Sequence, residues 1–235
     1  MEKGLTLSRS GPDASQPYRE LLGSLMYIML SVRPEICYPD GYLRRFQQQP
    51  NTEHWQALKR IVRYLQGTIK TKLNFKRDPT SKPLVGYVDA DWASDTEDRK
   101  SVSGYLFKVF GSSVIWCSKK QTTVATSSSE AEYIALSAAV AESLWLKGIL
   151  EDLQESNIHI TMYEDNRSCI CMAKNLETKR TKHIDIKHHF VRDHVASGVL
   201  KIEPIKTQNQ LADNFTKALD HNRFKTLRMM IGLSD

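Results

Sequence analysis

Apolar residues recur at helical spacing through the N-terminal third of the chain. The spacing predicts helices at Tyr18 to Val32, Asp40 to Gln48 and His54 to Gln66, the first ending before Pro34 and the last before Gly67. Lysine and arginine residues occupy polar positions around the second and third helices. We therefore expect a small helical unit with a basic outer surface.

Beyond this unit the apolar period changes from helical to alternating. Alternation predicts strands at Leu84 to Ala90, Ser103 to Phe110 and Ser113 to Ser118, and a shorter one at Leu73 to Phe75. The tight turn at Gly111 joins the second and third of the longer strands. An antiparallel meander is the expected arrangement.

The second half of the chain alternates between helix and strand. A long and almost uniformly apolar helix, at about Ser128 to Leu153, precedes a strand at Ile158 to Glu164. A helix of this length between two strands favours parallel pairing of the later strand with the first strand of the meander. The remaining predicted elements are helices at Asn166 to Asn175, Ile184 to Ala196, Gln210 to Leu219 and His221 to Leu233, and a strand at Val199 to Lys206.

Composition suggests where the domains divide. The polar, proline-containing stretch Arg77 to Pro83 is typical of a linker. We expect an N-terminal linker and helical unit at residues 1–78, an α/β domain at 79–219 and a C-terminal helix at 220–235.

Charge and cysteine content narrow the class of partner. The 235 residues carry a net charge of +6, with 40% hydrophobic residues, which excludes a disordered tail and favours a polyanionic partner. The longest apolar run, Leu21 to Val32, is too short to span a bilayer, so no membrane partner is expected. The four cysteines show no metal-ligand spacing, which favours a reducing, intracellular setting.

The strongest chemical signal is a strand that ends in paired carboxylates. Asp89 and Asp91 are two residues apart and so point to the same face of their strand. Such a pair is tolerated where a cation or a proton neutralises it, although a solvated strand end would show the same pattern. Further acids decide between these interpretations.

Three other segments supply such acids. Asp165 follows the predicted parallel strand, so it should lie beside Asp89 at the carboxyl ends of neighbouring strands. Glu132 lies within the apolar long helix, where a carboxylate is costly unless it binds something. Glu130 belongs to a capping-box pattern with a structural role of its own. Asp213 is expected in the first turn of a later helix, where the helix dipole alone also favours an acid.

Asp89, Glu132, Asp165 and Asp213 together match the needs of phosphodiester hydrolysis by two divalent cations. Magnesium suits oxygen ligands and retains water molecules. The sequence offers no Ser-His-Asp or Cys-His arrangement and no glycine-rich nucleotide loop to compete with this interpretation. The histidine cluster at His183, His188 and His189 lacks acid or cysteine partners at zinc spacing, so contact with phosphate or neighbouring loops is favoured instead.

Several segments in a fixed order are similar to one known family. They resemble the ribonuclease H domain of copia-type retrotransposon Pol polyproteins, while Arg33-Pro-Glu35 and Arg63-Tyr-Leu-Gln-Gly-Thr68 resemble the connection from the polymerase to that domain. The segments are Tyr87-Val-Asp-Ala-Asp-Trp-Ala93, Lys100-Ser-Val-Ser-Gly-Tyr-Leu-Phe107, Ser127-Ser-Ser-Glu-Ala-Glu-Tyr-Ile-Ala-Leu136, Tyr163-Glu-Asp-Asn166, Thr181-Lys-His-Ile-Asp-Ile-Lys187 and Leu211-Ala-Asp-Asn-Phe-Thr-Lys217.

The resemblance implies an α/β fold, a mixed five-stranded sheet with flanking helices, preceded by the small helical unit. It implies that Asp89, Glu132, Asp165 and Asp213 bind two magnesium ions, for which manganese can substitute, with Glu130 as the alternative helix ligand and Asp91 in a supporting position. The implied activity is cleavage of the RNA strand of an RNA/DNA hybrid, leaving a 3′ hydroxyl and a 5′ phosphate. The implied setting is a virus-like particle in the cytoplasm, or the nucleus.

The sequence departs from the family pattern at three points, which leaves an alternative function open. The histidine that many ribonucleases H carry before the last acid is missing. Cys37-Tyr-Pro-Asp-Gly41 replaces what looks like a continuous helix in relatives, and this interruption should weaken the N-terminal packing. No Tyr-x-Asp-Asp motif is present, so the chain alone should not synthesise DNA. Lys119, Lys120 and Lys182 are expected to hold the hybrid backbone, with the remainder of a reverse transcriptase as a further partner. The alternative function is a non-catalytic nucleic-acid-binding relic of such a polyprotein.

Overall fold

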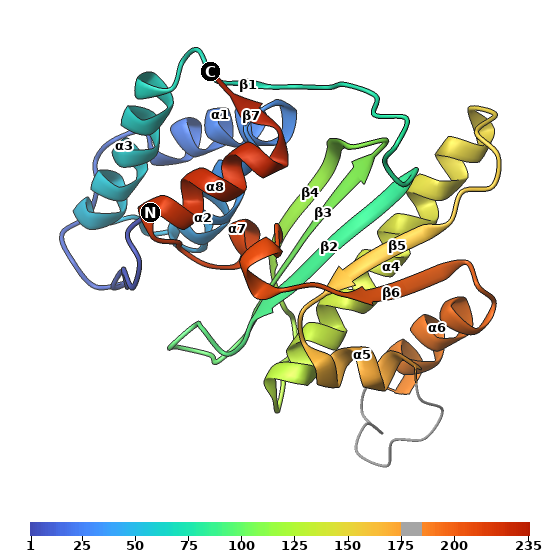
Figure 1. The fold of residues 1–235 in the computed structure, drawn as a ribbon. Helices are drawn as coiled ribbons and strands as arrows, with labels where there is room; N and C mark the ends of the chain where they lie inside the picture. The colour runs from blue at the N-terminus through green and yellow to red at the C-terminus, as the bar shows by residue number, and fades with distance from the viewer. Residues whose placement is uncertain (175–184) are drawn as a thin grey trace. The chain divides into compact units, whose positions relative to one another are not determined.

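A computed structural model describes residues 1–174 and 185–235, and these form two compact units. We call Met1–Asn74 with Lys217–Asp235 the helical unit, and Phe75–Thr216 the sheet unit. The C-terminal segment therefore belongs to the same compact unit as the N-terminal helices, although the whole sheet unit separates the two in sequence. Figure 1 shows the elements of both units.

The helical unit is built on a helix with one strongly apolar stripe. Tyr18, Leu22, Leu25 and Met29 form the buried face of the first helix, as their spacing predicts. The elements are α1 (Tyr18–Ser31), η1 (Pro34–Ile36), α2 (Cys37–Leu43), η2 (Arg44–Phe46), α3 (Thr52–Gly67), β1 (Lys72–Leu73), α8 (His221–Ile231) and β7 (Leu233–Ser234).

The expected interruption at Cys37 to Gly41 is wrong, because these residues form most of α2. Pro39 lies in the first turn, where a backbone N–H has no helical acceptor to lose, so the proline does not break the helix. The predicted helix at Asp40 to Gln48 accordingly begins earlier and passes into the short η2.

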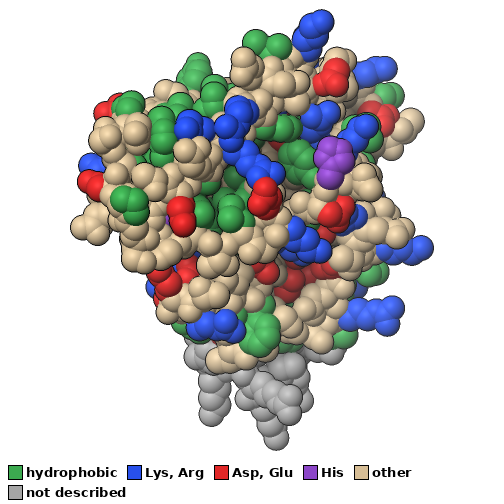
Figure 2. All heavy atoms as spheres, turned by 90° about the vertical axis from the view of Figure 1, so that its left-hand side faces the viewer, with side chains coloured by type: hydrophobic (Ala, Val, Ile, Leu, Met, Phe, Trp, Pro, Cys, Tyr) green, Lys and Arg blue, Asp and Glu red, His purple; other side chains and the backbone are tan. Residues whose placement is uncertain are grey.

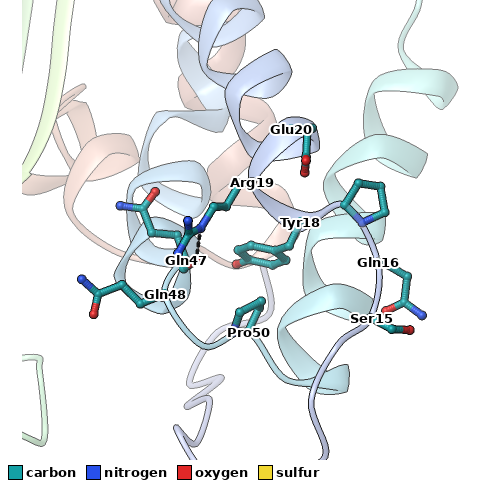
Figure 3. A pocket seen from close by; sticks show the side chains of 9 residues that line it. Ser15, Gln16, Tyr18, Arg19, Glu20, Gln47, Gln48 and Pro50 are labelled. Carbon is teal, nitrogen blue, oxygen red and sulfur yellow. Dashed lines mark hydrogen bonds between the residues drawn. The ribbon is translucent and has the colours of Figure 1, made fainter.

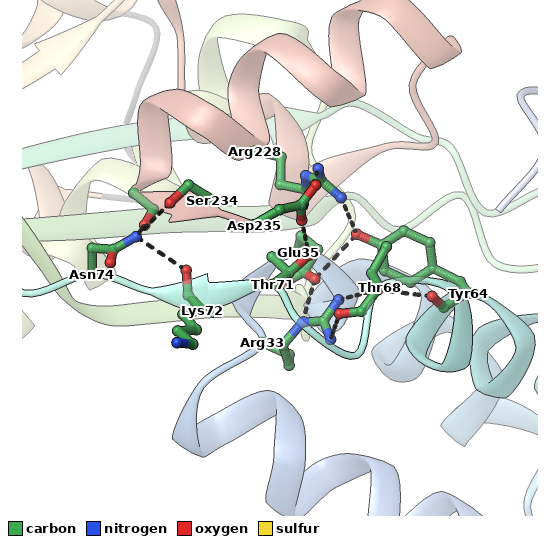
Figure 4. Close-up of polar contacts among 11 residues, drawn as sticks. Arg33, Glu35, Tyr64, Thr68, Thr71, Lys72, Asn74, Arg228, Ser234 and Asp235 are labelled. Carbon is green, nitrogen blue, oxygen red and sulfur yellow. Dashed lines mark hydrogen bonds and ion pairs between the residues drawn. The ribbon is translucent and has the colours of Figure 1, made fainter.

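The last residues of the chain pair with a strand of the helical unit. Gly232 adopts a left-handed conformation, φ 110°, which ends α8 and turns the last residues back. β7 then pairs antiparallel with β1, and the predicted strand at Leu73 to Phe75 therefore joins the chain end instead of the main sheet. Figure 4 shows this pairing beside Arg33, which donates to Glu35 over 2.6 Å and to the Thr68 hydroxyl over 2.6 Å.

The sheet unit contains a mixed five-stranded sheet in the order β4-β3-β2-β5-β6. β2, β3 and β4 run antiparallel as the predicted meander, while β5 pairs parallel with β2 and β6 parallel with β5. The predicted fold class and both predicted pairings are confirmed. The strands are β2 (Leu84–Asp91), β3 (Val102–Val109), β4 (Ser112–Lys120), β5 (Ile160–Glu164) and β6 (Leu200–Pro204).

One face of this sheet is covered by α4 (Ser128–Asp152), which packs on β2 and β3 and contacts α5 (Arg167–Lys174) and α6 (Asp185–Ala196) (Figure 1). By length and composition alone α4 is apolar enough to cross a membrane, but 56% of its most apolar window is buried inside the protein. Its apolar character thus agrees with its place in the core of the sheet unit.

The opposite face carries a short connection near the carboxyl end of β2. The predicted helix at Gln210 to Leu219 is reduced to α7 (Asp213–Thr216), preceded by η4 (Thr207–Asn209). Gln210 is extended, ψ 104°, because its buried amide donates to the Val88 carbonyl over 2.9 Å and to that of Tyr163 over 3.4 Å. These bonds tie the connection to the neighbouring strands β2 and β5.

Candidate metal centre

Three predicted carboxylates meet at the carboxyl ends of β2 and β5. Asp89, Glu132 and Asp165 each offer an oxygen within 4.8 Å of the other two. Tyr87 and Tyr163 are partners in the parallel ladder, and each aspartate follows its tyrosine by two residues, so both point to the same face. Parallel pairing of two strands far apart in sequence is therefore what brings the two aspartates together.

The structure separates the two glutamates of α4. Glu130 turns back to the helix start, where its Oε2 accepts from the Thr126 backbone N–H over 2.7 Å and from the Thr126 hydroxyl. Ser127 completes the cap by accepting from the Glu130 N–H over 3.2 Å. Glu132 instead lies with Asp89 and Asp165. Of the two glutamates, Glu132 is the one that lies in the group of carboxylates.

Burial makes the negative charge of this centre costly. Glu132 is 6% exposed, and burial is the main reason that its pKa rises well above its ordinary value, followed by the charges of Glu164, Asp89 and Asp165. Its Oε2 accepts no hydrogen bond from the described residues. A divalent cation would supply the missing partner and offset the repulsion, so this donor set fits a hard, oxygen-preferring ion.

A further buried carboxylate, Glu164, ends β5 directly before Asp165. It is fully buried, its Oε1 accepts from the Asn166 N–H over 2.9 Å, and its Oε2 has no partner among the described residues. Burial above all raises its pKa to about 8, and the charges of Asp165 and Asp89 add to this. Our sequence reasoning gave it no role, although it continues the buried alternation of Ile160 and Met162 and could have been found that way.

The fourth predicted ligand lies next to the centre but outside the group of three. Asp213 opens α7 and is buried, and the Thr216 hydroxyl contacts its carbonyl over 3.4 Å. The same hydroxyl donates to Asp89 Oδ2. Asp91, at the end of β2, is half-buried and also outside the group. Thr216 was missed by sequence reasoning, because a threonine three residues after an acid carries no distinctive signal.

The predicted histidine and lysine sites receive less support. His183 and Lys182 lie outside the described residues. His188 is buried and stacks on Tyr133 with ring centroids 4.0 Å apart, which places it in the core. Lys120 forms ion pairs with Asp95 and Asp98. On the face drawn in Figure 2, lysine and arginine side chains are spread among acidic and apolar ones.

A separate hollow lies in the helical unit (Figure 3). Tyr18 and Pro50 are among its lining residues, and at its edge the Arg19 Nε donates to the Gln47 carbonyl over 2.7 Å. Its lining includes none of the four predicted acids. The hollow is therefore not a part of the candidate metal centre.

Comparison with known proteins places the chain among transposon polyproteins. It is 41% identical over 230 residues, 97% of its length, to the retrovirus-related Pol polyprotein from transposon TNT 1-94 of Nicotiana tabacum, of which it spans 17%. It is 38% identical over 232 residues to the corresponding polyprotein from transposon RE1 of Arabidopsis thaliana, of which it spans 16%. No family model matches the chain.

Two further similarities cover part of the chain. Secreted RxLR effector protein 161 of Plasmopara viticola is 54% identical over 130 residues, which are 55% of this chain and 91% of that protein. Among solved structures, LC11-RNase H1, isolated from compost, has a TM-score of 0.45 and 15% identity over 58% of this chain and 94% of that one.

Proposed function

Because the chain belongs to the family of retrovirus-related Pol polyproteins from transposons, we propose that it is the ribonuclease H part of such a polyprotein. The predicted family membership is confirmed. The chain spans about a sixth of the relatives' length, so activity, substrate and partners are the proposal. The reaction is metal-dependent hydrolysis of the RNA strand in an RNA/DNA hybrid.

One observation carries this proposal: three carboxylates from β2, α4 and the end of β5 converge within 4.8 Å. Convergence of buried acids is unfavourable for folding, so it is expected where a function requires it. Asp89, Glu132 and Asp165 would hold divalent cations, with Asp213 adjoining from α7. Bound magnesium or manganese would supply a water of lowered pKa and would neutralise charge on the scissile phosphate.

The residues around the acids fix their positions. Thr216 donates to Asp89 Oδ2, which orients that carboxylate. Gln210 ties the connection before α7 to the carbonyls of Val88 and Tyr163. Glu130 caps the start of α4, the helix that carries Glu132. The site is thus supported from the strands, the long helix and the connection.

The proposal extends to partners and setting. The substrate is an RNA/DNA hybrid held through its phosphates without sequence readout, as the net charge of +6 favours. The helical unit would join the remainder of a reverse transcriptase. The proposed setting is intracellular, in the cytoplasm or the nucleus.

Hybrid cleavage tests the proposal. The purified chain should cut the labelled RNA strand of a hybrid when magnesium or manganese is present and should stop when the metal is chelated. Asp89→Asn and Asp165→Asn should abolish cleavage while the fold persists, because each keeps the size of the side chain and removes its charge. Salt-sensitive hybrid binding without any cleavage by the wild type would favour the non-catalytic relic.

A further inference from the structure

An exposed tryptophan follows the strand that carries Asp89. Trp92 directly follows β2, one residue after Asp91 and three after Asp89, and its side chain is 48% exposed. A tryptophan ring combines a large apolar face with one N–H donor, which suits contact with a partner at a surface. The apolar ring lies where the chain leaves the strand that carries the central aspartate.

Two contacts hold this ring in place. The indole Nε1–H donates to the Ala125 carbonyl over 3.1 Å, which ties Trp92 to the loop before α4. The next residue, Ala93, has φ 50°, and its N–H donates to the Ser101 hydroxyl over 3.1 Å. A left-handed alanine costs conformational energy, so the turn that directs Trp92 outward is maintained at the expense of stability.

The loop that accepts the indole bond extends the same surface. Val124, next to Ala125 in sequence, is 52% exposed, so the loop that accepts the indole bond also exposes an apolar side chain. The loop leads directly into the capped start of α4 at Ser128, four residues before Glu132. Trp92 is therefore attached to both segments, β2 and the start of α4, that supply acids to the centre.

From this placement we propose that Trp92 contacts the nucleic-acid substrate, packing its ring on the sugar or base of a nucleotide next to the phosphate at the metal centre. This inference rests on the proposed function and names a substrate contact that the acids do not provide. Aromatic rings stack on nucleotides of any sequence, which suits a nuclease that reads shape. The fixed indole means that little side-chain entropy is lost on binding.

Kinetics and equilibrium binding test the contact. Trp92→Ala should raise both KM for the hybrid and the Kd measured in calcium, each by about tenfold, within the range for loss of one stacked base. Its kcat should be unchanged, because the ring does not touch the reacting atoms. Trp92→Phe should retain most of the affinity, since it keeps a ring and loses only the bond to Ala125.

Trp145 provides a matched control. It is 58% exposed on α4, about 25 Å along the helix from its start at the usual rise per residue, so Trp145→Ala should leave KM and Kd unchanged. Hybrid should also quench tryptophan fluorescence in the wild type, and this quench should weaken in Trp92→Phe. Because the quench is measured in the wild type and in Trp92→Phe, it tests contact between Trp92 and the hybrid even where Trp92→Ala lowers the melting temperature.

The outcomes separate this inference from the proposed function. Unchanged Kd in Trp92→Ala, an equal loss in Trp145→Ala, or a loss in Trp92→Phe as large as in Trp92→Ala would each overturn the contact. A wild type that binds hybrid without cleaving it would refute the nuclease, while the Kd comparison would still decide on Trp92. A wild type that does not bind hybrid would overturn both.

Discussion

Replacing Glu164 by glutamine should stabilise the sheet unit at high pH. The carboxylate is fully buried and its pKa rises from 4.5 to about 8, chiefly through burial. Each unit of pKa difference corresponds to about 1.4 kcal/mol, so ionised Glu164 lowers the free energy of unfolding by up to about 5 kcal/mol above pH 8. Glutamine removes the charge and keeps an oxygen to accept from the Asn166 N–H.

The sign of the pH dependence follows from the raised pKa. Below about pH 4.5 the glutamate is protonated in both folded and unfolded states, and the variant should match the wild type. Between 4.5 and about 8 the folded state binds more protons, so wild-type stability falls as the pH rises and Glu164→Gln should gain relative to it.

Urea unfolding in a metal chelator, followed by tryptophan fluorescence at several pH values, measures this difference. Fluorescence suits the question because Trp92, Trp116 and Trp145 all belong to the sheet unit. Glu203→Gln is the control, since Lys201 and Lys82 lower the pKa of the half-buried Glu203 to about 2 and its replacement should give no gain at high pH. A stability difference that does not change with pH would refute the reasoning.

Three further results are expected. Gly104→Ala should destabilise the protein by about 1–3 kcal/mol and reduce cleavage, because its Cβ would lie 2.6 Å from Thr216 Cγ2, whereas Gly148→Ala on α4 meets nothing within 4 Å and should raise the melting temperature. Glu130→Ala should cost about 1 kcal/mol of stability through loss of the cap but keep cleavage activity, whereas Glu132→Gln should lose cleavage activity. Unfolding and hybrid-cleavage assays on both variants separate these roles. Deletion of residues 233–235 should lower the thermal stability of the helical unit by removing β7, measured by circular dichroism, and an unchanged melting curve would contradict the closing role of the chain end.

The sequence determined the order and type of most elements and the edge of the sheet that carries the site. Alternation along β2, β3 and β4 and the long helix before β5 require an antiparallel meander and a parallel return. Because parallel strands align their carboxyl ends, Asp89 and Asp165 could be paired without a structure. Local periodicity and connection rules were sufficient for this part of the prediction.

Only the tertiary structure decided which side chains face the centre. α4 is apolar on nearly every side, so its periodicity could not separate Glu132 from Glu130, and the packing against β2 did so. The bond from Thr216 to Asp89 joins residues 127 positions apart, and that from Thr71 to Asp235 spans 164 positions. Contacts at such separations depend on how packed elements meet in space, and the pattern along one segment carries no information about its distant partner.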